Sequence, residues 1–287
     1  MSKNLFYNNT NYKELPELPL DIVELYCNNN PLLKKLPELT SDLKKIFCSN
    51  NALLYKLPEL PSNLQQLCII NNSLLKRLPE LPSSLKILYC DNNLLLEKLP
   101  ELPSSLKYLY CSTNPLLKEL PELPSSLEEL DCSNNSLLKQ LPQLPSSIKY
   151  LKYNNNPLIK RLPKLPSNLK CLQCNNNLLI TELPELPSSL EELYCNNNLL
   201  ITELPELPSS LEELYCNNNP LLTTLPKSII YCKNINNYNN NYSNYSNNHY
   251  KKYNDLKYLD SLPYLVNKCI ENYYYKPIMD YYNSKYL

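Results

Sequence analysis

The sequence predicts a solenoid of short stacked coils whose strands form one parallel β-sheet, and three observations support this fold class. A Leu-Pro pair recurs every 21 residues from Leu15 to Leu225 without insertion or deletion. Residues 15–224 therefore hold ten complete copies of one unit, and a fixed short period is typical of a solenoid. Each copy contains one segment of alternating apolar and variable residues, as in a strand with one buried face.

Within a unit such as residues 99–119, the first segment is Leu-Pro-x-Leu-Pro. Proline fixes φ near about −65° and keeps the preceding residue out of the helical region, so this segment is predicted to be extended, polyproline-like or 3-10. Ser-Ser follows as a turn. The next pattern, L-x-x-L-x-C, here Leu106, Leu109 and Cys111, predicts a short strand with its apolar side inward.

One asparagine recurs after every predicted strand. Because the chain has no glycine, turns that require positive φ are also expected at asparagine. A repeated amide can bridge backbone groups of its own coil and the next, so we predict a buried hydrogen-bonded ladder rather than a row of solvated turn residues. The ladder would comprise Asn30, Asn51, Asn72, Asn93, Asn114, Asn135, Asn156, Asn177, Asn198 and Asn219.

The pattern L-x-x-L-x-C-x-x-N-x-L followed by L-P resembles the leucine-rich repeat over residues 15–224. The L-P-x-L-P linkage is similar to the short repeats of bacterial effector proteins, although each unit here is one residue longer. The Asn-rich, glycine-free composition resembles leucine-rich repeat proteins of giant DNA viruses of amoebae, and of amoebae. The resemblance implies a right-handed, curved solenoid with the parallel sheet on its concave face and extended segments on its convex side.

Most of the twelve cysteines share one repeat position, which is occupied by Ile69 and Tyr153 in two units. They are therefore predicted to be small apolar core residues rather than disulfides or metal ligands. Cys171 and Cys174 form a lone C-x-x-C pair, but strand parity places Cys171 outward and Cys174 inward. No catalytic, cofactor-binding or metal-binding residue is predicted.

The strand position before the core cysteine faces outward and carries many aromatic residues. Exposed aromatic side chains on a rigid sheet make good interface anchors, although tyrosine also simply suits strands. Lysines of the same face concentrate in units two to eight, whereas the last two units are acidic. Residues 178–198 and 199–219 are identical, so duplication also explains the acidic end. The candidate partner-binding face comprises Tyr26, Phe47, Tyr89, Tyr110, Tyr194, Tyr215, Glu191 and Glu212.

The chain is predicted to divide into five segments. Residues 1–14 form an N-terminal cap or degenerate half-coil, and residues 15–224 form the ten repeats. Residues 225–232 form a shortened terminal coil in which Cys232 echoes the core cysteine. Residues 233–253 are an Asn/Tyr-rich low-complexity linker. Residues 254–287 contain a predicted helix at 262–275, which would cap the solenoid or bind a partner.

Lysine plus arginine and aspartate plus glutamate both number 28, so the net charge is zero and nucleic-acid binding is not expected. No apolar run approaches the roughly 20 residues of a membrane span, and the N-terminus has no secretory pattern. We expect an intracellular, cytoplasmic monomer, in the host cytoplasm if the protein is viral.

The predicted function is that of a non-catalytic module that binds an unknown protein partner through its concave face. One alternative is the substrate-recognition part of a ubiquitin-ligase-like effector, although only about 55 residues follow the terminal coil, which is too few for the catalytic domain that this resemblance implies. The other alternative is a duplicated repeat protein with no strong partner.

Overall fold

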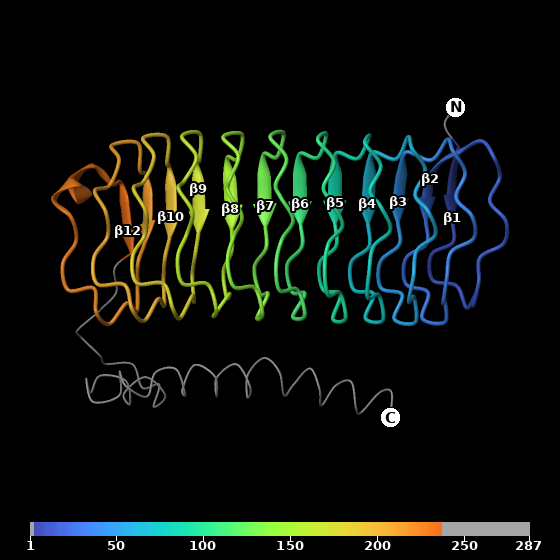
Figure 1. Cartoon of the computed structure of the whole chain (residues 1–287), viewed down its shortest axis with the longest axis horizontal. Helices are drawn as coiled ribbons and strands as arrows, with labels where there is room; N and C mark the ends of the chain where they lie inside the picture. Colours follow the sequence, from blue (N-terminus) through green and yellow to red (C-terminus); the bar gives the residue numbers. More distant parts are fainter. Residues whose placement is uncertain (1–2, 237–287) are drawn as a thin grey trace, which may run out of the picture.

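The structure, a computed structural model, describes residues 3–236. These residues form a stack of coils whose strands make one twelve-stranded parallel sheet (Figure 1). The spatial order of the strands is their order in the sequence, so each coil contacts only its neighbours. The strands are β1 (Lys3–Phe6), β2 (Ile22–Tyr26), β3 (Lys45–Phe47), β4 (Gln66–Cys68), β5 (Ile87–Tyr89), β6 (Tyr108–Tyr110), β7 (Glu129–Asp131), β8 (Tyr150–Lys152), β9 (Cys171–Gln173), β10 (Glu192–Tyr194), β11 (Glu213–Tyr215) and β12 (Asn234–Asn236).

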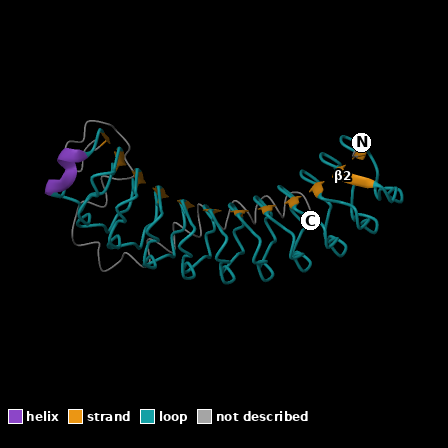
Figure 2. Cartoon of the chain, turned by 90° about the horizontal axis from the view of Figure 1, so that it is seen from above, coloured by secondary structure: helices purple, strands orange, loops and turns teal. Residues whose placement is uncertain are grey.

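The stack of coils curves into an arc, with the strands along its inner side (Figure 2). The predicted curved solenoid with its sheet on the concave face is therefore confirmed. On the other side of each coil the Leu-Pro-x-Leu-Pro segment forms no helix, as expected where prolines are closely spaced. Within residues 3–236, the one 3-10 helix is η1 (Lys227–Tyr231).

Equivalent residues of successive coils lie side by side in the sheet. Leu109 aligns with Leu88 on one side and with Leu130 on the other, 21 residues away in each direction. All three side chains are fully buried, and each contributes about 1.5–3 kcal/mol through burial. The first coil is one residue shorter, because Asn4 aligns with Glu24.

A residue with positive φ follows each strand from β1 to β11, two positions after the core position. Ten of these residues are asparagine, with φ between 55° and 60°, as expected for a chain without glycine. The eleventh is Thr113, whose φ is 57°. The full set is Asn9, Asn29, Asn50, Asn71, Asn92, Thr113, Asn134, Asn155, Asn176, Asn197 and Asn218.

The C-terminal end of the described array differs from the prediction. Helix η1 and strand β12 extend the last coil to Asn236. The prediction that a linker begins at residue 233 is therefore wrong. Asn234 aligns with Glu213, and Cys232 therefore takes the position of Leu211 rather than that of the core cysteine. The remainder of the predicted linker, to residue 253, and the predicted helix at 262–275 lie outside the described residues.

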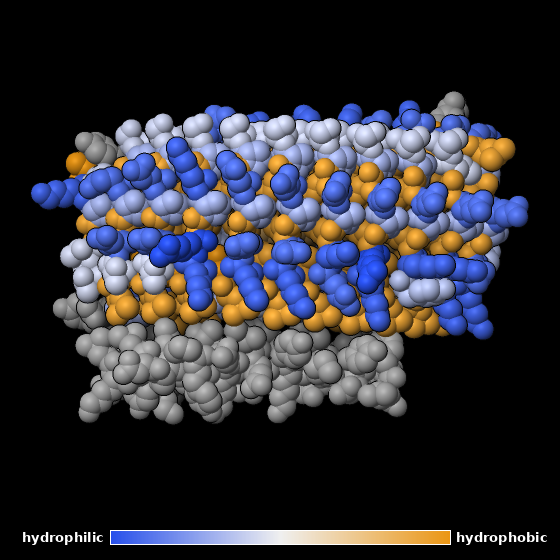
Figure 3. Space-filling model, viewed as in Figure 1, coloured by the Kyte–Doolittle hydropathy of each residue, from blue (hydrophilic) through white to orange (hydrophobic). Residues whose placement is uncertain are grey.

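Repetition of one unit turns each repeat position into a row along the molecule. The surface in Figure 3 shows such rows, in which hydrophobic and hydrophilic residues alternate across the width of the solenoid. A side chain on this protein is therefore flanked by the equivalent residues of the two adjacent coils. Side chains of the concave face are flanked by equivalent residues of adjacent coils in the same way.

Candidate functional site

The six aromatic residues predicted for the candidate face occupy the last position of their strands and are half-buried. The structure brings them together in three separate clusters rather than in one stripe. Stacked coils lie about 4.8 Å apart, which suits the offset stacking of aromatic rings. The ring centroids are 4.7 Å apart for Tyr26 and Phe47, 4.6 Å for Tyr89 and Tyr110, and 4.8 Å for Tyr194 and Tyr215.

Phe6 of β1 extends the first cluster, with its ring centroid 4.7 Å from that of Tyr26. Phe6 is not predicted from the repeat pattern, because it precedes the first complete repeat. Its side chain is 61% exposed, so the first cluster ends at an open edge of the sheet. Residue alternation within β1, which places Phe6 two positions after Asn4, could have identified it.

A second outward row lies at the first position of the strands and was also missed. It includes Ile87, Tyr108 and Tyr150, of which Tyr150 is 42% exposed. These residues lie two positions before the residues of the first row, and the period of a strand could have located them. Two rows of large side chains therefore run along the middle of the concave face.

Hydroxyl groups of the aromatic clusters are bound by carboxylates of the same face. Tyr26 donates to Glu24 over 2.7 Å, and this hydrogen bond is the main cause of the raised pKa of the Tyr26 phenol. Tyr194 donates to Glu213 over 2.9 Å, and burial together with this bond raises the pKa of Tyr194 well above its usual range. The phenolic groups are thus neutral donors held in fixed orientations.

Acidic residues of the candidate face are already paired with lysines of adjacent coils. Glu191 lies 2.8 Å from Lys170, and Glu212 pairs with Lys233. The sequence predicts these glutamates to form an acidic end that meets a partner, and the structure instead shows each one opposite a lysine 21 residues away. Charge patterns at this spacing form ladders of ion pairs, which contribute little to stability where they are exposed.

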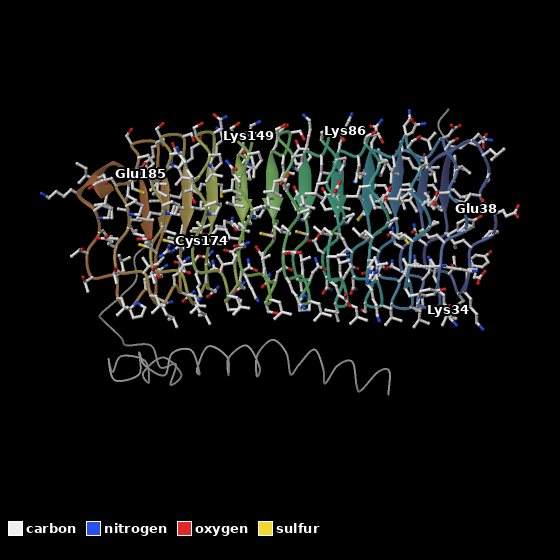
Figure 4. All side chains as sticks on the ribbon, viewed as in Figure 1. Lys34, Glu38, Lys86, Lys149, Cys174 and Glu185 are labelled. Carbon is white, nitrogen blue, oxygen red and sulfur yellow. The ribbon has the colours of Figure 1, made fainter. Side chains whose placement is uncertain are left out.

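Farther along the same face, Glu128 is shared by two lysines. Its carboxylate lies 2.9 Å from Lys107 and 3.0 Å from Lys149, and the two ammonium groups lower the pKa of Glu128. These residues surround an open depression of about 340 Å³, which is also lined by Ser126, Ser147 and Asn168. Lys86 and Lys149 lie along one long edge of the solenoid, whereas Lys34 lies along the opposite edge (Figure 4).

Beneath the face, the ten repeated asparagines are fully buried and hydrogen-bonded between coils. The Asn51 amide oxygen accepts the backbone N–H of Asn30 over 2.8 Å, and its Nδ2 donates to the carbonyl of Cys27 over 3.0 Å. In Asn114, Nδ2 also donates to the carbonyl of Cys111 in its own coil over 2.8 Å. Each amide therefore ties its coil to the coil before it.

A second polar ladder, not foreseen, occupies the position after the core residue. There the side chain of one coil accepts the backbone N–H of the next coil: Ser112 donates to Asp91 over 2.8 Å, and Asn196 donates to Asn175 over 2.7 Å. Burial raises the pKa of Asp91, although the hydrogen bonds from Ser112 oppose this shift. The ladder closes the rim of the sheet with groups that are already hydrogen-bonded.

All eleven described cysteines are free, and those at the core position point inward as predicted. Cys171 occupies an outward position, as its parity required, but it is only 5% exposed because larger residues flank it in β8 and β10. Among residues 3–236 no group of three or more His, Cys, Asp or Glu side chains is arranged to hold a metal ion. In the same part of the chain no helix has the length and apolar character needed to span a membrane.

Comparison with known proteins gives three findings. The sequence profile of the Leucine Rich Repeat family matches residues 126–151 and 210–232. A search of curated proteins finds no match. Among solved structures, the chain is 30% identical to YopM from Yersinia pestis, which is described as a leucine-rich effector protein; the match covers 81% of this chain and 88% of that one, with a TM-score of 0.40.

Two other solved structures are similar. YopM from Yersinia enterocolitica is 30% identical, with a TM-score of 0.42, and the match covers 78% of this chain. The chain spans 61% of the length of that protein. A leucine-rich repeat protein from Bacteroides ovatus is 17% identical, with a TM-score of 0.43, and the match covers 76% of this chain and 67% of that one.

Proposed function

This chain belongs to the leucine-rich repeat family, and from that premise we propose that it is a non-catalytic module that binds a protein partner through its concave face. The observation that carries the proposal is the outward row of half-buried aromatic residues held in fixed stacks on one continuous sheet. Large side chains that are already ordered lose little entropy on binding, so they serve well as interface anchors.

The polar groups of the face support the same proposal. Tyr26 and Tyr194 have their hydroxyls fixed by glutamates, so their orientation is set before a partner arrives. Lysines and glutamates around them present a defined charge pattern, which favours orientation and specificity over affinity. A cytoplasmic location and a monomeric state remain predictions.

The test is affinity capture from cell lysate, followed by mass spectrometry, with wild type and two matched variants. The concave variant is Tyr194→Ala, Tyr215→Ala, Glu212→Lys. The control variant, Tyr55→Ala with Glu185→Lys, changes exposed residues that lie outside the strands. Thermal unfolding of all three proteins checks that each one is folded.

A protein retained by wild type and by the control, but lost by the concave variant, is the expected result. Retention of the same proteins by all three would show that the Tyr194–Tyr215 cluster does not bind them. Loss in the control variant alone would place the interaction outside the concave face. Either of these results would contradict the proposal for this cluster.

A further inference from the structure

Four lysines and one glutamate form a row at the positions that immediately precede five consecutive strands, β5 to β9. We call this set the lysine row: Lys86, Lys107, Glu128, Lys149 and Lys170. Its formal charge is +3, from four positive groups and one negative group. Because successive coils lie about 4.8 Å apart, the row spans about 19 Å along the sheet.

The positive charge of the lysine row is only partly neutralised within the chain. Lys107 and Lys149 share the single carboxylate of Glu128, and among the described residues no ion pair involves Lys86. Lys170 pairs with Glu191 of the next coil. The paired lysine side chains remain 43–48% exposed, and an ammonium group has three N–H donors, so each can bind a second carboxylate.

Carboxylates near the row are already occupied by donors of this chain. Glu129 lies 3.5 Å from Lys152. Glu128 and Glu129 are therefore less available to a basic partner than the lysines are to an acidic one.

An apolar row lies directly beside the lysine row, one residue farther along each strand. Its large members are Ile87, Tyr108 and Tyr150, and Glu129 of β7, which is paired with Lys152, interrupts the row between the two tyrosines. The open depression of about 340 Å³ between Lys107 and Lys149 lies within the lysine row itself. Parallel cationic and apolar rows match a ligand that offers carboxylates on one side and apolar groups on the other.

We propose that the partner of the concave face presents an acidic, extended polypeptide segment to coils β5 to β9. Its carboxylates bind the lysine row, and its apolar side chains contact Ile87, Tyr108 and Tyr150. About six residues of extended chain, at about 3.3 Å each, cover the 19 Å length of the row. This inference rests on the proposed function and adds an acidic contact at the middle of the face to the contact proposed at the Tyr194–Tyr215 cluster.

The test measures binding of fluorescent peptides of about eight residues, long enough to span the row. One probe alternates Glu and Leu, one alternates Lys and Leu, and one alternates Ser and Leu, and a single-stranded oligothymidylate is added as a fourth. The full chain is compared with Lys86→Glu, Lys149→Glu and with a control, Lys34→Glu, Lys118→Glu. Both variants make the same change of charge at exposed lysines, and thermal unfolding checks that both fold.

The expected result is that the Glu-Leu probe binds more tightly than the other three. Its dissociation constant rises at least about tenfold in the Lys86/Lys149 variant and changes by less than about twofold in the control. Carbodiimide crosslinking should attach the probe to Lys86, Lys107, Lys149 or Lys170, and not to Lys34.

Absence of binding, an equal loss in both variants, or crosslinks outside the lysine row would overturn the inference. Tighter binding of the Lys-Leu probe or of the oligothymidylate would overturn it as well. The concave-face function would survive any of these results if the Tyr194, Tyr215, Glu212 variant still lost a captured protein that the control retained. Failure of that capture experiment is therefore separable from failure of the acidic-partner inference.

Discussion

At the scale of single residues, Thr113 is the position at which sequence and backbone conflict. It has a φ of 57° at a site where the other ten coils have asparagine. A β-branched residue in this region is strained by about 1–2 kcal/mol, whereas asparagine tolerates it. We expect Thr113→Asn to raise the free energy of unfolding by about 1 kcal/mol, measured by urea denaturation.

The reverse substitution, Asn134→Thr, serves as the matched control, because Asn134 has the same conformation in the next coil. It should lower the free energy of unfolding by a similar amount. If both substitutions were neutral, backbone strain at this position would not limit the stability of the array.

Tyr153 is the second residue that departs from the repeat. It is fully buried at the core-cysteine position, and burial raises the pKa of its phenol well above the usual range. Its hydroxyl faces the Cys174 thiol but has no hydrogen-bond partner of ordinary geometry. Since an unsatisfied buried polar group costs about 1–3 kcal/mol, Tyr153→Phe should stabilise the fold by about 1 kcal/mol or more.

The ring of Tyr153, in contrast, should be essential to the packing of its coil. We expect Tyr153→Ala to lower the free energy of unfolding by about 3–5 kcal/mol, because it leaves a cavity the size of the ring. Equal effects of the Phe and Ala substitutions in thermal and chemical denaturation would contradict this account of the site.

The burial of a single residue could be predicted from the sequence where the same residue type repeats in every coil. It could not be predicted where it depends on the side chains of the adjacent coils. The burial of Asn51 and Asn114 follows from an amide repeated in every coil. The low exposure of Cys171 does not, because it depends on the bulk of Tyr150 and Glu192 in the adjacent strands. Parity fixes the direction of a side chain, and its exposure depends on the residues beside it.

At the scale of structural elements, the buried asparagine ladder joins each coil to the one before it. Removing the amide of Asn135 leaves the backbone N–H of Asn114 without its acceptor, whereas the carbonyls of Cys111 and Cys132 lose one of two amide donors and keep Asn114 and Asn156. An unsatisfied buried N–H costs about 1–3 kcal/mol, so we expect Asn135→Ala to destabilise the protein by about that amount in urea denaturation.

Asn63→Ala is the control for the ladder. Asn63 is exposed, and its side chain makes one hydrogen bond, to the carbonyl of Ser41 over 3.1 Å. An exposed substitution of this kind should change the free energy of unfolding by no more than about 0.5 kcal/mol. A comparable loss in both variants would mean that burial of the ladder contributes nothing specific.

The cysteine row gives a second prediction at this scale. Burial raises the pKa of Cys174 and of Cys216 to about 12, so almost no thiolate is present at pH 8. Among the described cysteines, Cys68 and Cys232 are the two with substantial exposure, and we expect iodoacetamide to modify them first in the folded protein. Peptide mass spectrometry resolves the sites, and denaturant should make all of them reactive.

In the same alkylation experiment, the rate at which Cys171 reacts tests its low exposure in the structure against its outward position in the sequence pattern. Its outward parity predicts early alkylation, whereas its low exposure and its pKa, raised to about 12 mainly by burial, predict protection. Because a raised pKa suppresses the thiolate, its modification rate should increase as the pH rises. Alkylation of Cys171 as fast as Cys68 would contradict the packing of β8, β9 and β10.

At the scale of the whole molecule, the fold could be predicted almost entirely, because one unit is repeated without interruption. The arrangement of the concave face could be predicted only in part. The outward positions follow from strand parity, but the division of the aromatics into three clusters depends on which residues meet across coils. The pairing of Glu191 with Lys170 arises in the same way, because a 21-residue separation in sequence becomes direct contact.

The concave surface therefore carries two distinct regions, with the lysine row over β5 to β9 and a glutamate-rich end at β10 and β11. This asymmetry gives a bound partner a direction along the solenoid, since reversal would place like charges together. A symmetric, featureless face would permit sliding between coils.

Side-chain footprinting with hydroxyl radicals, with and without the captured partner, shows which face of the solenoid the partner covers. We predict that the partner lowers the oxidation rate of Tyr108 and Tyr150 on the concave face and leaves Tyr55, which is 49% exposed outside the strands, unchanged. Protection of Tyr55 with no change at Tyr108 and Tyr150 would contradict binding by the concave face.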